Sequence, residues 1–123
     1  CLIKAIGKDI DTDSFGIALK TKFTALKEKL DGPYGKSDVT DMLFPGSIWD
    51  DPDDFMMGLI KKERLLAAHW GTDTGPILKD GIREIYLVAS PLNQSKGYLV
   101  LEYYGADWNA CNNAIESVAD DAL

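Results

Sequence analysis

Apolar residues recur along this chain with two different spacings, and these spacings predict helices and strands. The helical spacing, in which apolar residues lie three and four positions apart on one face, occurs in three segments. The first runs from Phe15 to Leu30, the second covers residues 55–60, and the third extends from Trp108 to Ala122. Each of these segments is expected to bury one face and to expose the other.

The second spacing is the alternation of apolar and polar residues that is typical of a strand with one buried face. It occurs at residues 65–70, 84–89 and 98–104, and residues 2–8 are interpreted as a further short strand. The predicted strands at 65–70, 84–89 and 98–104 follow one another in the sequence and are joined by short connections. Strands joined by short connections usually pair antiparallel.

Turn and capping residues separate the predicted elements. Residues 9–14 are rich in Asp, Thr and Ser, which favour the start of a helix. Gly32 and Pro33 are expected to end that helix. Residues 33–50 are interpreted as a long connection with some apolar anchors, 71–81 as a loop, and 90–97 as a hairpin connection.

The resulting order is strand, helix, helix, strand, strand, strand, helix, and it predicts an α+β fold. Because each helix has an apolar face to bury, the simplest arrangement is a two-layer sandwich, with three helices packed on a mainly antiparallel sheet of about four strands. No repeat or linker divides residues 1–123, which predicts a single domain that could form the later part of a longer chain. This layout could belong to many small bacterial proteins, and no motif carries a resemblance to one family.

Tyrosines gather in one phase of the predicted strands. Tyr86, Tyr98 and Tyr104 alternate with the apolar residues that would face the helices, and Glu84 and Glu102 share their phase. Such a face is too apolar for ordinary solvent-exposed surface, and tyrosine-rich faces are common at interfaces. The five residues are therefore candidate partner-binding residues. A second packed layer or a homodimer contact would explain the same pattern, whereas Trp49 and Trp108 are assigned to the core or its rim.

Composition and charge narrow the class of partner. The 123 residues include 46% apolar residues, with 13 Lys and Arg against 20 Asp and Glu, for a net charge of −7. This composition is typical of a soluble globular domain, and no apolar run approaches the roughly 18 residues of a membrane span. Residues 1–36 carry seven basic and five acidic groups, and residues 37–123 carry six and fifteen. An acidic chain is unsuited to nucleic acid and would attract a basic partner.

Two acidic segments invite a metal-site interpretation, and both are better explained as helix starts. Asp50, Asp51, Asp53 and Asp54 surround Pro52, and capping by Asp51, proline at the first helical position and acidic residues in the first turn all fit a helix N-terminus. Residues 9–20 begin like a calcium loop, but Ser14 and Lys20 replace the Gly and Glu that such a loop requires. No metal or other cofactor is expected.

No catalytic constellation is evident. His69 is the only histidine, and it lies in an apolar strand beside Trp70, where a structural role is expected. A Ser, His and Asp arrangement would need it, and no nucleophile motif accompanies it. Residues 32–37 end in Gly-Lys-Ser, but they follow a predicted helix and lack the spacing of a phosphate-binding loop.

The two cysteines, Cys1 and Cys111, leave the compartment open. Both are expected to be small buried apolar residues, and the alternative is a disulfide that closes a long loop. The start at Cys1 fits a mature form, a later part of a longer protein, or a lipid-anchored bacterial protein whose first residue is a modified cysteine. Secreted, periplasmic and lipid-anchored locations therefore all stay open.

These observations favour a non-enzymatic, acidic protein-binding domain. Its partner would be a basic protein or a second copy of the chain, and one specific form of the hypothesis is an immunity or inhibitor protein. The first alternative is a ligand-binding or enzymatic domain with a pocket between sheet and helices, where Asp50, Asp51, His69 or Tyr104 would supply polar groups. The second alternative is a structural module of a secreted or envelope protein.

Overall fold

One open, fully antiparallel sheet organises the whole chain. The structure is a computed structural model that describes residues 1–72 and 77–122, with side chains described as far as residue 116. Its strands are β1 (Leu2–Ile6), β2 (Ile10–Asp11), β3 (Asp38–Leu43), β4 (Arg64–Gly71), β5 (Ile82–Asn93) and β6 (Lys96–Gly105). The order across the sheet is β1-β6-β5-β4-β3, and β2 continues the β1 edge by pairing with β6.

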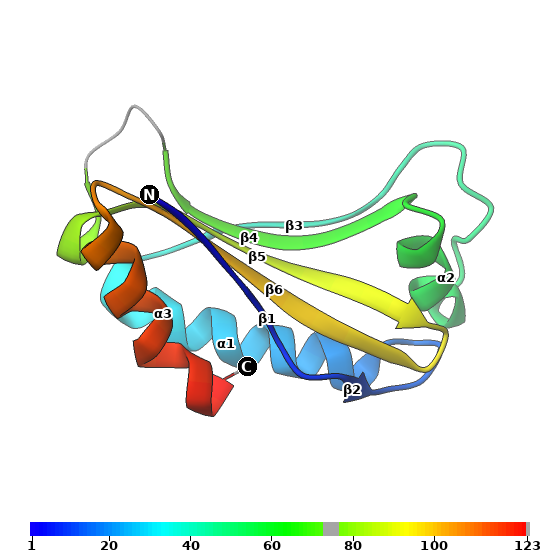
Figure 1. Cartoon of the computed structure of the whole chain (residues 1–123). Coiled ribbons are helices and arrows are strands. Elements are labelled where there is room, and N and C mark those ends of the chain that lie inside the picture. The colour runs from blue at the N-terminus through cyan, green and yellow to red at the C-terminus, as the bar shows by residue number, and fades with distance from the viewer. Residues whose placement is uncertain (73–76, 123) are drawn as a thin grey trace.

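Helices cover one face of this sheet (Figure 1). They are α1 (Ile17–Tyr34), α2 (Phe55–Ile60) and α3 (Trp108–Ala122), with short 3₁₀ helices at Pro52–Asp54 and Lys79–Gly81. Helices α1 and α2 pack mainly against β5 and its neighbours, and α3 packs against β1 and β6. The α+β sandwich predicted from the sequence is therefore confirmed. No helix in the described part of the chain is long and apolar enough to cross a membrane.

The core lies between the helices and this covered face. Its fully buried side chains include Trp70 from β4, Leu87 from β5 and Tyr103 from β6. From the helices, Leu19, Phe23, Leu26 and Leu30 of α1 and Phe55, Met56 and Leu59 of α2 complete it. The predicted helical stripe of α1 is thus buried, except that Phe15 precedes the helix and is 43% exposed. Trp108 was also assigned to the core or rim and is 63% exposed, so that assignment was wrong.

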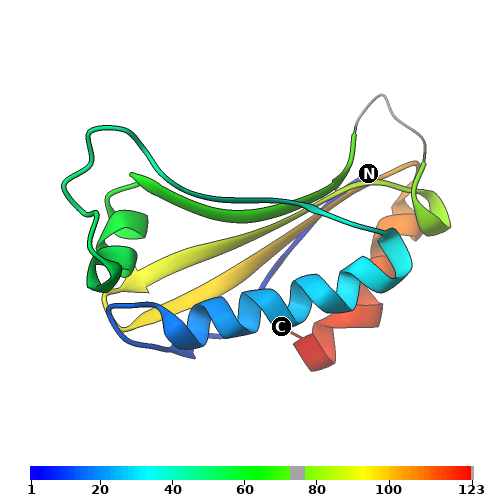
Figure 2. The ribbon, with the colours of Figure 1, turned by 180° about the vertical axis from the view of Figure 1, so that it is seen from behind.

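The opposite face of the sheet is left uncovered by the described elements. Seen from either side, α1 and α3 lie together beneath the strands, and β4 arches with both ends raised away from α1, whereas β3 starts close to the end of α1 (Figures 1 and 2). Strand residues that alternate with the core residues point to this face. Tyr86, Tyr98 and Tyr104 are among them, as the alternation in the sequence predicted. We call it the open face.

Two strands were missed in the sequence. Residues 38–43, interpreted as part of a connection, form the edge strand β3, and Ile10–Asp11, interpreted as a capping turn, forms β2. Strand β5 also continues to Asn93, so the predicted hairpin connection is much shorter than residues 90–97. In each case pairing with a neighbouring strand fixes the backbone where burial is incomplete, so the sequence carries little alternation there.

Helix α1 continues past the predicted stop at Gly32 and Pro33 and ends at Tyr34. A proline clashes with the Cβ of the residue before it when that residue is helical, and Gly32 has no Cβ. The start of α1 follows the prediction more closely. The Thr12 hydroxyl accepts a hydrogen bond from the amide of Ala18 and the Asp13 carboxylate accepts one from that of Ile17, each at 3.2 Å.

Asp31 fastens the last turn of α1 to the sheet. Its carboxylate accepts hydrogen bonds from Lys27 Nζ at 2.6 Å, from Trp70 Nε1 at 3.1 Å and from the Ser37 amide at 3.2 Å. Burial alone would raise the pKa of Asp31, but the hydrogen bonds from Lys27, Ser37 and Trp70 and the charge of Lys27 outweigh it, so this pKa lies below its usual value.

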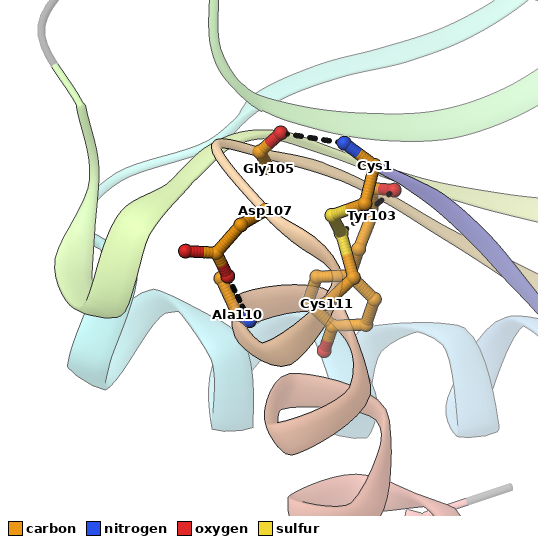
Figure 3. The surroundings of a disulfide bond; sticks show 6 residues. All are labelled: Cys1, Tyr103, Gly105, Asp107, Ala110 and Cys111. Carbon is orange, nitrogen blue, oxygen red and sulfur yellow. Dashed lines mark hydrogen bonds between the residues drawn. A yellow bond between two sulfur atoms is a disulfide. The ribbon is translucent and has the colours of Figure 1, made fainter.

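A disulfide between Cys1 and Cys111 joins the beginning of β1 to α3 (Figure 3). The two Cα atoms lie 6.4 Å apart, within the usual range for such a bond. The backbone nitrogen of Cys1 also donates to the Gly105 carbonyl at 2.8 Å, which extends the β1–β6 ladder. The expectation of two buried, unbonded cysteines was wrong, because Cys1 is exposed and its sulfur reaches the buried Cys111.

Candidate functional site

The open face carries a row of polar and aromatic side chains that crosses five strands. Successive Cα partners place Asp38 of β3 beside His69 of β4, then Tyr86 of β5, Glu102 of β6 and Lys4 of β1. Because strand partners project to the same side of a sheet, these five side chains share the open face. The neighbouring row contains Glu84 of β5, whose partner is Tyr104 of β6.

Hydrogen bonds tie the two rows together. The Glu84 carboxylate accepts from His69 Nε2 and from the Tyr86 hydroxyl, each at 3.1 Å. Since a carboxylate only accepts, His69 carries its proton on Nε2 in this arrangement. The Tyr104 hydroxyl donates to Glu102 at 3.3 Å, and Lys4 Nζ lies 3.5 Å from the same carboxylate. The Glu84 side chain is only 13% exposed, so these donors replace much of its solvent.

Ring contacts hold the aromatic side chains of these rows in place. The rings of His69 and Tyr86 stack with centroids 4.2 Å apart and planes 10° from parallel. Tyr86 in turn meets Tyr104 edge to face at 5.8 Å. Both arrangements are favoured by the ring quadrupoles. We call His69, Tyr86, Tyr104, Glu84 and Glu102 the aromatic cluster.

The electrostatics of the aromatic cluster are those of an anionic surface. Desolvation, the charge of Glu102, the hydrogen bond to Glu102 and the charge of Glu84 together raise the pKa of Tyr104 above its usual value. A phenol that resists ionisation keeps its proton as a hydrogen-bond donor. The fixed carboxylates and the electron-rich ring faces are the groups that attract a guanidinium or ammonium ion.

The structure brings four of the five predicted partner-face residues together. Tyr86, Tyr104, Glu84 and Glu102 belong to the aromatic cluster. Tyr98 also faces the open side, but it lies six residues before Tyr104 on β6, roughly 20 Å away along the strand. It lines a groove at the other end of the sheet instead.

Sequence reasoning missed His69 and Lys4 as residues of this face. His69 was expected to be a structural histidine in an apolar strand, and its side chain is 29% exposed and paired with Glu84. The signal was present, because His69 shares the phase of Leu65 and Ala67, opposite to the buried Trp70. The pairing register that sets His69 against Tyr86 cannot be read from either strand alone.

The acidic segment 50–54 forms the predicted helix start. Asp54 accepts a hydrogen bond from the Asp51 amide at 3.4 Å, and Pro52 begins the 3₁₀ helix that leads into α2. Carboxylate oxygens of Asp50, Asp51 and Asp54 lie within 4.8 Å of one another, and Asp53 is not part of that group. Lys20 and Arg64 line the same small cavity as Asp50 and Asp51 and offset their charge.

The polar residues considered for a pocket between sheet and helices do not converge. Asp50 and Asp51 lie beside Phe55 at the start of α2, whereas His69 and Tyr104 lie on the open face. No serine, threonine or cysteine is among the hydrogen-bond partners of His69 and Glu84 in the described part of the chain.

Comparison of the chain with protein-family models, with curated proteins and with solved structures finds no match.

Proposed function

We propose that this protein is a non-enzymatic binding domain that recognises a basic protein through its open face. The observation that carries the proposal is the aromatic cluster, in which stacked rings and two carboxylates are fixed by contacts within the chain. A surface whose side chains are already ordered loses less entropy when a partner binds. The chain's net charge of −7 favours the approach of a cationic partner over long distances.

An arginine of the partner suits the aromatic cluster best. Its planar guanidinium can stack on Tyr86 or Tyr104 while its N–H groups donate to Glu102. An immunity or inhibitor protein, which neutralises a basic toxin or nuclease by covering it, is the specific form of this function that we favour. It requires no bound metal or substrate at the interface, only charge and shape that complement the partner.

The disulfide is typical of proteins that fold in an oxidising compartment. We therefore place the protein outside the cytoplasm, in the periplasm or in the extracellular medium. A lipid anchor on Cys1 is disfavoured, because the thioether would need the same sulfur atom that bonds to Cys111.

The test is affinity capture from the source organism with open-face variants. Tyr86→Ala and Glu102→Lys should each reduce recovery of one basic protein at least tenfold, and raising the salt from about 50 to 500 mM should do the same. Glu28→Lys is the matched control, because it makes the same charge change at an exposed position of α1. The captured protein must then bind the purified domain directly.

Two outcomes would contradict the proposal. One is recovery of the same proteins by all variants at both salt concentrations. The other is a dimer in sedimentation equilibrium that Tyr86→Ala dissociates, because the open face would then serve a second copy of the chain.

A further inference from the structure

The sheet divides at the end that is remote from the aromatic cluster. Strands β4 and β5 pair from Gly71 and Glu84 as far as Ala67 and Val88. Beyond that point β4 stays paired with β3 down to Arg64, while β5 stays paired with β6 up to Asn93. The separation of β4 from β5 widens towards α2 in both views (Figures 1 and 2).

A groove of about 600 Å³ occupies this division, which is within the range of small-molecule sites. Most of its walls are apolar and come from the loop after β3, from α2, and from the facing ends of β4 and β5. The apolar lining residues are Phe44, Leu59, Ile60, Leu65, Ala89, Pro91 and Leu92. Phe44 and Leu92 are 41% and 50% exposed, so the groove presents apolar surface directly to solvent.

The charged lining residues of the groove are Lys62 and Arg64, and no Asp or Glu is among its described lining residues. The charge of Arg64 is offset by the Asp41 carboxylate, 3.0 Å away, so Lys62 supplies the positive charge of the groove. Arg64 is fixed by a 3.0 Å hydrogen bond to Asp41 and by its position over the Phe55 ring, while its Nε is buried without a hydrogen-bond partner among the described residues. Lys62 lines the groove, is exposed and forms no ion pair within the described part of the chain.

We propose that this groove binds a single-chain anionic amphiphile, such as a fatty acid. The acyl chain would lie between Leu65 and Leu92, and the carboxylate would pair with Lys62 near Arg64. An apolar groove with an exposed cation in its lining is complementary to an apolar tail with an anionic head, and unlike the aromatic cluster it repels basic ligands. This activity does not depend on the proposed protein partner, because it uses different residues and a ligand of opposite charge.

Isothermal titration with decanoate below its micelle concentration tests the proposal directly. Lys62→Glu should weaken decanoate binding about tenfold, because it replaces attraction of the carboxylate by repulsion. Lys61→Glu is the matched control, since Lys61 is the exposed neighbour that does not line the groove. Decanol, which lacks the charge, should bind the wild type about as weakly as decanoate binds Lys62→Glu.

The contact between the acyl chain and the apolar walls of the groove is tested separately. Octanoate should bind about tenfold more weakly than decanoate, because two methylene groups are lost from the apolar contact. Leu92→Asp should abolish binding, whereas Ile77→Asp, at a residue of similar exposure outside the groove, should leave it unchanged. Failure of decanoate to bind, equal affinity in Lys62→Glu and Lys61→Glu, or preferential binding to phosphatidylglycerol vesicles over decanoate would each overturn the proposal.

Discussion

The two faces of the sheet are built from the same strands, but a tyrosine on one face differs from a tyrosine on the other in its burial and in the hydrogen bonding of its hydroxyl. Tyr103 and Tyr104 are adjacent on β6, and they point to the covered face and the open face respectively. Tyr103 is fully buried, and its hydroxyl has no hydrogen-bond partner among the described residues. Tyr104 is partly exposed, and its hydroxyl donates to Glu102.

This difference separates stability from recognition. On the covered face a tyrosine contributes through its ring, and its unpaired hydroxyl is a cost that packing outweighs. On the open face the hydroxyl is satisfied, and the ring remains available to a partner. Substitutions on the covered face should therefore change the free energy of unfolding, and substitutions on the open face should change binding.

The largest effect is expected from removing the disulfide that holds α3 against the covered face. The loop it closes spans 110 residues in sequence, so the Cys1→Ser and Cys111→Ser double variant should lose about 4 kcal/mol of unfolding free energy. Urea denaturation of this variant, beside the wild type with and without reductant, measures the loss. Equal stability of the oxidised and reduced wild type would show that packing alone holds α3.

A smaller loss of unfolding free energy is expected from truncating side chains of the sheet, and this loss should differ between the covered face and the open face. Leu87→Ala removes a fully buried side chain from the centre of the core and should cost about 3 kcal/mol. Val88→Ala, at the next residue of β5 and on the open face, should cost about 1 kcal/mol, because that side chain is only partly buried. Urea midpoints measure both. Equal losses would mean that the open face is covered in solution.

The smallest effect on stability is expected from removing the hydroxyl of either adjacent tyrosine, Tyr103 or Tyr104. Tyr103→Phe should stabilise the protein by about 1 kcal/mol, because it removes a buried hydroxyl without a partner. Tyr104→Phe should leave stability almost unchanged and weaken partner binding. Thermal unfolding of the two variants is the measurement, and destabilisation by Tyr103→Phe would reveal a hidden partner for that hydroxyl.

The pH dependence of stability sharpens the tyrosine comparison. Burial, followed by the nearby Tyr34, raises the pKa of Tyr103 far above its usual value. The unfolded chain therefore loses this proton first, so the contribution of Tyr103 to stability is constant below about pH 10 and falls as the pH rises further. In Tyr103→Phe this part of the alkaline loss should disappear. Unfolding curves between pH 8 and 11 check it.

The sequence predicts most of the fold because burial and pattern agree in the central elements. Buried and partly exposed residues alternate along most of β4 and β5, since one face of each strand is the core. Strand β6 follows the same phase, except that Val100 on the open face is also buried. Edge strand β3 was missed because Val39 and Met42, on its two faces, are 47% and 42% exposed, so burial imposes no alternation there. Its existence depends on pairing with β4, which is a tertiary interaction.

The candidate site was predictable only in part for a similar reason. Alternation assigns Tyr86, Tyr104, Glu84 and Glu102 to one face, and the structure agrees. Contact between His69 and Glu84 depends on the register of β4 against β5, and the groove depends on where that pairing stops. The disulfide joins residues at opposite ends of the chain, so their spacing carries no information about their contact.

The bond between Cys1 and Cys111 also determines how this domain would bear mechanical load. Tension applied to the backbone outside the two cysteines passes through the sulfur atoms and bypasses the residues between them. The sheet, the open face and the groove all lie within that shielded span. A domain tethered and stretched at both ends would therefore keep its binding surfaces intact until the bond itself was reduced.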